Sequence, residues 1–194
     1  MPSQSPRLIF ITIENYNREF KGKYILATQL SSMGFSVLLG HKSLIRKFAS
    51  LPLFRGSIFI EKGLKNGSFP FLSRLRDNDI KIYTFDEEAL MQTDFSTYLR
   101  LNHEASVRHL LSGVFSWGPM HSNLLQYAGY NQSQILRTGN PRFDNFIISS
   151  SQPKSPSSPY ILICSRFASA NPASKGKSSR LPRDGSQKYI DDSL

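Results

Sequence analysis

The stretch RLIFITIENYNREFKGKYILATQLSSMGFSVLLG, residues 7–40, decides the fold class of this chain. A continuous apolar run at 7–13 is typical of a buried strand, and a second such run follows at 36–40. Between these runs, apolar residues recur at helical spacing until Gly34 ends the pattern: Phe20, Tyr24, Ala27 and Leu30. The stretch therefore predicts a strand, an amphipathic helix and a second strand.

The same alternation continues to residue 148. Further strands are expected at the apolar runs 56–63, 80–85, 113–117 and 134–139. Helices are expected at 41–52, 69–78, 103–111 and 119–128, with one more that opens at Pro141. Apolar strands that alternate with amphipathic helices indicate a parallel sheet covered on both faces and joined by right-handed crossovers. The predicted fold class is α/β, with a doubly wound, mostly parallel Rossmann-like sheet.

The composition changes beyond residue 148. Six serines and three prolines fall within residues 149–159, which is typical of an extended tether. YILIC at 160–164 indicates a new strand, but few apolar residues follow it. We expect four parts: a Rossmann-like domain at 1–148, a linker at 149–159, the first strand and loop of an incomplete second domain at 160–172, and a disordered tail at 173–194.

The formal net charge is +10 over 194 residues. Lys and Arg exceed Asp and Glu by 17 to 11 up to residue 149 and by 7 to 3 beyond it, so the C-terminal part is proportionally more basic. Because the basic residues form no block and are not interleaved with aromatic residues, nucleic acid is not an expected partner. One cysteine, Cys164, excludes an internal disulfide framework and favours a cytoplasmic setting.

Common catalytic motifs are absent from the sequence. It contains no GxSxG, no GxxxxGK[ST] and no GxGxxG, which excludes the hydrolase elbow, the P-loop and the dinucleotide fingerprint. His103 and His109 fall on an expected helix as surface or packing residues, whereas His41 and His121 follow strands. Neither pair has the spacing of metal ligands, so no metal site is predicted.

Ligands of an open parallel sheet bind beyond the carboxyl ends of its strands. Polar residues follow the expected strands there: Glu14, Asn15, Arg18, Glu19, His41, Lys42, Lys62, Asp86, Glu87, Glu88, His121, Asn140 and Arg142. Any loop of such a protein is polar, and acidic residues at Asp86 or Glu87 also suit a helix N-terminus.

Two groups of residues at this edge suggest a specific chemical role. Glu14 or Glu19, with Arg18, can orient an acceptor hydroxyl or deprotonate it, and the alternative is a local ion pair. Arg142, at a helix start, can bind a phosphate, and the alternative is a surface pair with Asp144.

Five segments together resemble bacterial surface carbohydrate biosynthesis proteins: 14–42, 85–90, 115–125, 138–144 and 160–172. The first contains a Glu-x-x-x-Arg-Glu-Phe loop at Glu14 to Phe20 and a Gly-x-Lys at Gly40 to Lys42. The fourth, TGNPRFD, also resembles the Gly-x-Pro-Arg-x-Asp element of glycerophosphotransferases and capsule sugar transferases. Those proteins share the two-domain GT-B glycosyltransferase architecture.

The resemblance implies an N-terminal domain that receives the acceptor and a C-terminal domain that holds a nucleotide-activated donor. It implies Glu14 and Glu19 as catalytic candidates. It implies these substrate-binding residues: Arg18, Lys42, Glu87, His121, Asn140 and Arg142. Ser165 and Asn171 would be remnants of the donor side. The implied reaction needs no metal or cofactor, with a nucleotide sugar as donor substrate and a carbohydrate or glycolipid as acceptor.

Proteins of this kind continue through a whole second domain, whereas the sequence after Pro172 does not resemble one. We therefore expect a truncated glycosyltransferase-like protein that is not active alone. One alternative is a non-catalytic scaffold that docks on a separate donor-domain protein or peripherally on the inner face of the cell membrane. Another alternative is a sugar-nucleotide epimerase.

Overall fold

The computed structural model describes residues 8–64, 67–87, 98–99, 102–103, 105–143 and 159. The chain divides into two compact units, Met1–Ser151 and Gln152–Leu194, and the fold below is that of the first unit. The expected linker up to residue 158, the strand at 160–164 and the tail at 173–194 lie outside the described residues and stay predictions.

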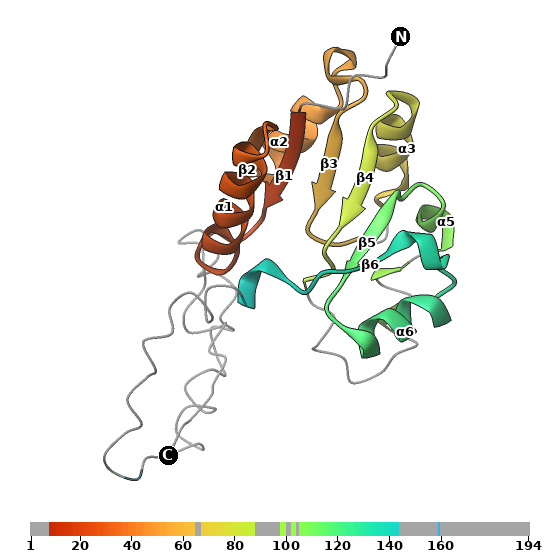
Figure 1. Cartoon of the computed structure of the whole chain (residues 1–194). Helices are drawn as coiled ribbons and strands as arrows, with labels where there is room; N and C mark the ends of the chain where they lie inside the picture. The colour runs from red at the N-terminus through yellow and green to blue at the C-terminus, as the bar shows by residue number, and fades with distance from the viewer. Residues whose placement is uncertain are drawn as a thin grey trace, which may run out of the picture. The chain divides into compact units, whose positions relative to one another are not determined.

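Six parallel strands form one sheet in the order β2-β1-β3-β4-β5-β6 (Figure 1). They are β1 (Leu8–Ile13), β2 (Ser36–His41), β3 (Ile58–Glu61), β4 (Lys81–Thr84), β5 (Gly113–Ser116) and β6 (Ile135–Arg137). Every neighbouring pair is parallel, with Ile9 opposite Val37 on one side and Ile58 on the other. The predicted α/β, Rossmann-like parallel sheet is confirmed.

The helices follow the strands in alternation. They are α1 (Tyr16–Ser32), α2 (Lys42–Ala49), α3 (Phe69–Asp77), α5 (Ala105–Arg108) and α6 (Pro119–Tyr127), with short 3₁₀ turns η1 (Pro52–Phe54) and η2 (Gln132–Gln134). The helix expected at 103–111 is shorter in the structure. Leu110 and Leu111 donate to carbonyls three residues back, which tightens the chain before it enters β5. No described helix is long and apolar enough to cross a membrane.

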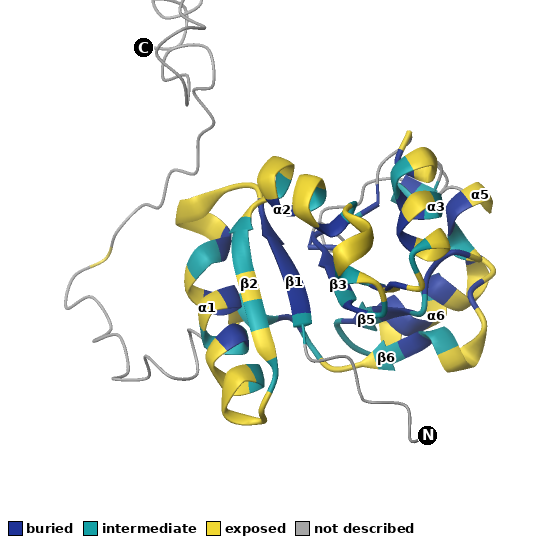
Figure 2. Cartoon of the chain, turned by 90° about the horizontal axis from the view of Figure 1, so that it is seen from above, coloured by how far each residue is buried: buried dark blue, intermediate teal, exposed yellow. Residues whose placement is uncertain are grey.

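Strand side chains alternate between two hydrophobic cores. Phe10 of β1 packs in a core with Ile45 of α2, Leu72 of α3 and Leu125 of α6. Its neighbours Ile9 and Ile11 pack in the other core with α1. Because successive strand residues point to opposite faces, α1 covers one face, and α2, α3 and α6 lie on the opposite one with α5 (Figure 2).

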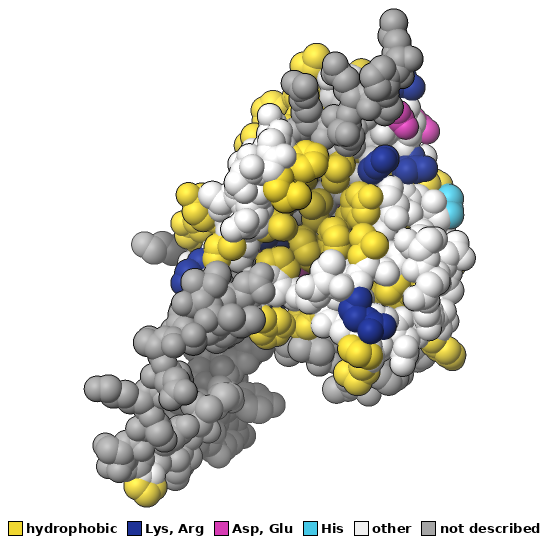
Figure 3. Space-filling view, in the orientation of Figure 1, with side chains coloured by type: hydrophobic (Ala, Val, Ile, Leu, Met, Phe, Trp, Pro, Cys, Tyr) yellow, Lys and Arg dark blue, Asp and Glu magenta, His cyan; other side chains and the backbone are white. Residues whose placement is uncertain are grey.

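The α1 face is only partly covered by the described helices. Tyr83 and Phe115 lie there as a stacked pair, 5.6 Å between ring centroids, and each is only partly buried. Figure 3 shows hydrophobic side chains gathered over the middle of the molecule on the side seen in Figure 1. Helices were expected over both faces of the sheet. On this face, α1 packs on β1 and β2, whereas β4 and β5 are less fully covered.

The apolar spacing that predicted α1 marks its buried side only in part, at Ala27 and Leu30. Tyr24 is exposed, and the buried residues of the helix are Glu19, Gly22, Lys23 and Ala27. Rings of Tyr16, Phe20 and Tyr24 instead stack along the outer side, with centroids 4.5 and 5.6 Å apart. Tertiary charge pairing overrides hydrophobic periodicity here, because the inner side of α1 meets buried carboxylates.

Candidate functional site

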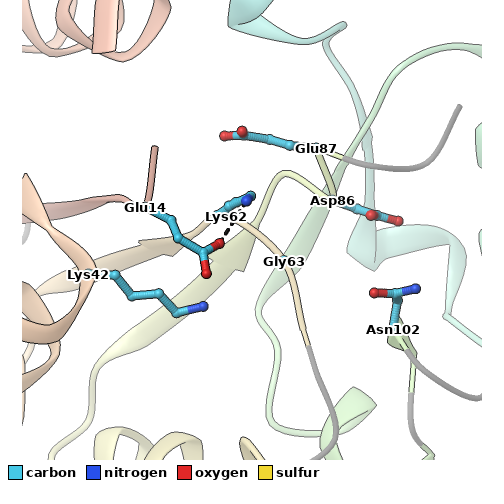
Figure 4. Close-up of a pocket in the computed structure, with 7 residues that line it drawn as sticks. All are labelled: Glu14, Lys42, Lys62, Gly63, Asp86, Glu87 and Asn102. Atoms are coloured by element: carbon cyan, nitrogen blue, oxygen red, sulfur yellow. Dashed lines mark hydrogen bonds and ion pairs between the residues drawn. The ribbon is translucent and has the colours of Figure 1, made fainter. Parts of the chain in front are cut away.

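A small open pocket lies at the carboxyl edge of the sheet (Figure 4). Its lining residues are Glu14, Lys42, Lys62, Gly63, Asp86, Glu87 and Asn102. Apart from Asn102, they follow the ends of β1, β2, β3 and β4 directly in sequence. The structure thus brings Glu14, Lys42 and Glu87 together at the edge where the sequence placed them.

Glu19 is fully buried and surrounded by donors. Its carboxylate accepts the backbone N–H groups of Glu14 at 2.9 Å and Asn15 at 3.2 Å. It also pairs with the side chains of Lys23 (3.0 Å), Lys62 (3.3 Å) and Arg18 (3.6 Å). Burial by itself raises the pKa of Glu19, but the Glu14 N–H and the lysine charges outweigh it and lower the pKa to about 2.

A carboxylate with such a low pKa is a weak proton acceptor near neutral pH. Glu19 is therefore placed to hold the loop and the lysines, and the local Glu19–Arg18 ion pair that the sequence left open is present. Glu14 differs, because its side chain is 40% exposed and lines the pocket. Its carboxylate accepts a hydrogen bond from Lys62 Nζ at 2.7 Å. Burial lowers the pKa of Lys62, but this hydrogen bond and the charges of Glu19 and Glu14 outweigh burial, so the pKa is raised.

Lys23 joins Glu19 to the next strand. Its ammonium is 3% exposed, donates to the Thr12 carbonyl at 2.7 Å, and lies 3.0 Å from Glu19 Oε2 and 2.6 Å from Glu87 Oε1. Burial raises the pKa of Glu87 even though Lys23 opposes this. The other carboxylate oxygen of Glu87, Oε2, is buried and has no hydrogen-bond partner.

A second buried carboxylate, Glu61, ends β3. Arg46 contacts its Oε2 with Nε at 2.8 Å and Nη2 at 2.6 Å, and the Thr12 hydroxyl donates to Oε1 at 3.0 Å. Lys42 Nζ lies 3.6 Å from Oε1, which holds this predicted binding residue at the pocket wall. The sequence analysis did not single out Glu61. Its position at the end of an apolar run could have indicated a buried carboxylate.

Asp86 is the centre of a third buried cluster that sequence reasoning also missed. Its Oδ2 accepts from Tyr98, lies 2.8 Å from His103 Nε2 and lies 3.5 Å from His121 Nε2. His103 Nδ1 is 3.0 Å from the Tyr130 hydroxyl. The sequence grouped His103 with His109 and His121 with His41, so this meeting of residues from three separate segments was not visible.

The three ligand-type atoms of Asp86, His103 and His121 lie within 4.8 Å of one another, which is close enough for a metal ion. A metal ion would need unprotonated ring nitrogens facing Asp86, whereas the ring tautomers place protons there. The Trp117 N–H donates to His121 Nδ1 at 3.2 Å, which places the ring proton on Nε2, facing Asp86.

The tautomer of His103 follows from its tyrosine neighbour. Burial raises the pKa of Tyr130, so its hydroxyl keeps a proton to donate to His103 Nδ1, leaving Nε2–H for Asp86. Burial also raises the pKa of Asp86, but the contacts from His103 and His121 outweigh it and lower that pKa. The prediction of no metal stays a prediction.

The Gly-Asn-Pro-Arg turn after β6 packs directly on α1. A Cβ added at Gly22 would lie 2.5 Å from the Pro141 carbonyl oxygen, so only glycine allows this approach. Asn140 is buried and accepts the Arg142 N–H at 3.0 Å, while its Nδ2 has no partner. The alternative pairing of Arg142 with Asp144 lies outside the described residues.

Asn140 belongs to a different pocket from Glu14, Lys42 and Glu87. This second pocket lies on the α1 face and is mostly apolar, lined by Leu26, Leu30, Ile60, Phe85, Phe115, Thr138, Gly139, Asn140 and Pro141. His121 lines neither pocket. The structure therefore brings the catalytic candidate Glu14 and two predicted binding residues, Lys42 and Glu87, into one pocket, and it places Asn140 in the other. Ser165 and Asn171 lie outside the described residues.

Three predicted binding residues share an unusual property. Each of Glu87, His121 and Asn140 is at least nine-tenths buried and carries a buried polar atom without a hydrogen-bond partner. The three atoms are Glu87 Oε2, His121 Nε2 and Asn140 Nδ2, from the segments that follow β4, β5 and β6. Because native proteins leave few such groups, their location at one edge of the sheet indicates a ligand-binding edge.

Comparison with known proteins returned no match: no family model, no curated protein and no solved structure corresponds to this chain. The resemblance to surface carbohydrate biosynthesis proteins therefore stays a prediction.

Proposed function

We propose that this chain is the acceptor-side domain of a GT-B-like glycosyltransferase of surface polysaccharide or glycolipid biosynthesis, acting in the cytoplasm. The acceptor, a carbohydrate or glycolipid headgroup, binds in the pocket of Glu14, Lys42, Lys62 and Glu87. The observation that carries this proposal is Glu87 Oε2, a buried carboxylate oxygen without a hydrogen-bond partner on a residue that lines this pocket.

A sugar suits this edge because each hydroxyl both donates and accepts a hydrogen bond. The edge offers both kinds of partner: carboxylate oxygens at Glu14 and Glu87, and an ammonium at Lys42. Apart from Gly63, every residue that lines the pocket carries a charged or polar group, which favours a polyhydroxylated ligand over an apolar one. Binding of this kind satisfies groups that the chain itself leaves unpaired.

Within this proposal, Glu14 accepts the proton of the acceptor hydroxyl as that oxygen bonds to the anomeric carbon of the donor. The bond from that carbon to the nucleoside diphosphate breaks, and the diphosphate leaves with the electron pair. Glu19 fixes the loop and the lysines beside Glu14. Arg142, after the Gly-Asn-Pro turn, is the candidate for neutralising phosphate charge. The reaction also needs a nucleotide-sugar donor and a domain that holds it, which the described residues do not include.

Saturation-transfer NMR of the full chain against a panel of sugars, nucleotides and nucleotide sugars tests this function. We expect at least one sugar to bind, with affinity at least tenfold weaker in Glu14→Gln and in Lys42→Ala. Asp77→Asn, an exposed acidic residue at the end of α3, is the matched control and should bind as the wild type does. No sugar binding, or equal binding by all four proteins, would refute the proposal.

A second function is a non-catalytic scaffold that docks on a partner. The apolar pocket lined by Leu26, Phe85 and Phe115 favours it, because an apolar face that the described helices leave partly open can receive another protein. The NMR panel would then find no sugar or nucleotide ligand. Light scattering would find an association that Phe115→Ser weakens.

A further inference from the structure

Residues 20–60 contain no Asp or Glu, yet they carry six basic residues: Lys21, Lys23, Lys42, Arg46, Lys47 and Arg55. Among the described residues, the same segment holds seven of the twelve large hydrophobic side chains that are exposed: Tyr24, Met33, Leu38, Leu44, Phe48, Leu51 and Leu53. Positive charge beside exposed apolar surface is the composition of segments that bind the interface of anionic membranes.

The apolar residues of α2 and η1 gather on the outer side of these two elements. Leu44 and Phe48 lie one helical turn apart, while Ile45 and Ala49 point into the core. Arg46 is held inward, 2.6 Å from Glu61 and 4.6 Å above the Phe71 ring. The outer side of α2 is therefore left to Leu44, Lys47 and Phe48.

The turn after α2 extends this surface. The N–H of Leu51 donates to the Phe48 carbonyl at 2.9 Å, and that of Phe54 donates to the Leu51 carbonyl at 3.1 Å. Phe54 packs edge-on against buried Phe10, with ring centroids 5.3 Å apart. This anchor leaves Leu53 83% exposed at the tip of the turn.

Two basic side chains complete the surface. Lys47 and Arg55 are exposed, and neither forms an ion pair within the described part of the chain. Two acidic residues, Asp77 and Asp79, flank Asn78, whose carbonyl accepts from the Gly56 N–H at 3.2 Å. Three basic residues lie near them in the sequence: Arg74, Arg76 and Lys81. The neighbourhood therefore stays positive.

We propose that Leu44, Phe48, Leu51 and Leu53, together with Lys47 and Arg55, form a basic apolar surface that binds an anionic lipid bilayer. The leucine and phenylalanine side chains enter the headgroup region, and the two cations lie among the anionic headgroups. Lys42, at the start of α2, lines the sugar pocket, so membrane binding would place that pocket near lipid-linked acceptors. This proposal does not depend on sugar binding.

The test is co-sedimentation of the full chain with vesicles of phosphatidylcholine alone and of phosphatidylcholine with phosphatidylglycerol. We expect at least tenfold stronger binding to the anionic vesicles, and weaker binding at high salt because the charges are screened. Each of Lys47→Ala and Arg55→Ala should weaken binding about fivefold, which corresponds to about 1 kcal/mol per basic residue. Phe48→Ser and Leu53→Ser should each weaken it at least as much.

Tyr127→Ser is the matched control, because Tyr127 is an equally exposed large side chain on α6 and should not affect binding. A tail variant, Lys175→Ala/Lys177→Ala/Arg180→Ala, separates this surface from the basic C-terminal segment. The proposal is overturned by equal binding to both vesicle types, or by binding lost only in the tail variant. A dimer that forms without vesicles and breaks on Leu53→Ser would assign the surface to a second copy of the chain instead.

Discussion

Replacing Lys23 by methionine tests the charge network that lies beneath the candidate site. The substitution keeps most of the side-chain volume but removes the ammonium that lies 2.6 Å from Glu87 and 3.0 Å from Glu19. Glu19 retains Lys62 and two backbone N–H donors, whereas Lys23 is the one ion-pair partner of Glu87 among the described residues. The cost therefore falls mainly on Glu87.

Removing one member of a buried ion pair costs about 3–5 kcal/mol, because the other charge is left in a poor solvent. Glu87 can take up a proton and so relieve part of this cost. We therefore expect the free energy of unfolding to fall by about 3 kcal/mol at pH 7. In a chain of this length, that is a drop in Tm of about 6–12 °C.

Urea unfolding followed by circular dichroism measures the change. Lys21→Met is the matched control, since Lys21 lies on the same helix but is exposed, and it should change stability by less than about 0.5 kcal/mol. Adding Glu87→Gln to Lys23→Met should restore part of the loss, because the amide carries no charge. Equal stability of Lys23→Met and Lys21→Met would refute the reasoning.

Three further predictions concern neighbouring parts of the site. Gly22→Ala should lower Tm although alanine favours helices, because its Cβ meets the Pro141 backbone at 2.5 Å; a higher Tm would contradict that packing. The pKa of Glu19 is lowered from 4.5 to about 2, so its ionised form stabilises the fold by about 3 kcal/mol above pH 4.5, and this stability is lost as the pH falls through 2. Urea titrations at several pH values should show this dependence in the wild type and not in Glu19→Gln. Stoichiometric Zn²⁺ should leave Tm unchanged, because the Nε2 proton of His121 faces Asp86; a rise in Tm that Asp86→Asn abolishes would instead identify a metal site.

Much of the binding edge was predictable because it follows from topology. Once the strands are parallel, the residues after each strand must gather at one edge, so Glu14, Lys42 and Glu87 were placed correctly by counting apolar runs. Which of them is buried was not predictable. Glu14 and Glu19 looked equivalent in the sequence, but the turn into α1 buries Glu19 and leaves Glu14 at the pocket.

The Asp86 cluster lay beyond local reasoning for a related cause. His103 is 17 residues from Asp86, and Tyr130 is 27 residues from His103, so neither pair has a spacing that a helix or a strand imposes. Their meeting depends on how α6 and the segment before α5 pack against the end of β4. The exposure of Tyr24 and the burial of Lys23 have the same origin, since the inner side of α1 is chosen by its tertiary neighbours.

The sequence by itself determined the strands, the helices and their alternation, because apolar runs and helical spacing reflect interactions within a few residues of each other. Those local patterns also predicted the parallel sheet and the polar residues that gather at its carboxyl edge. Only the tertiary structure decided which charges are buried together, which polar atoms are left without partners, and which apolar side chains face outward. These three properties depend on desolvation and on contacts between segments that are far apart in the sequence. A local sequence pattern does not specify the distances between such segments.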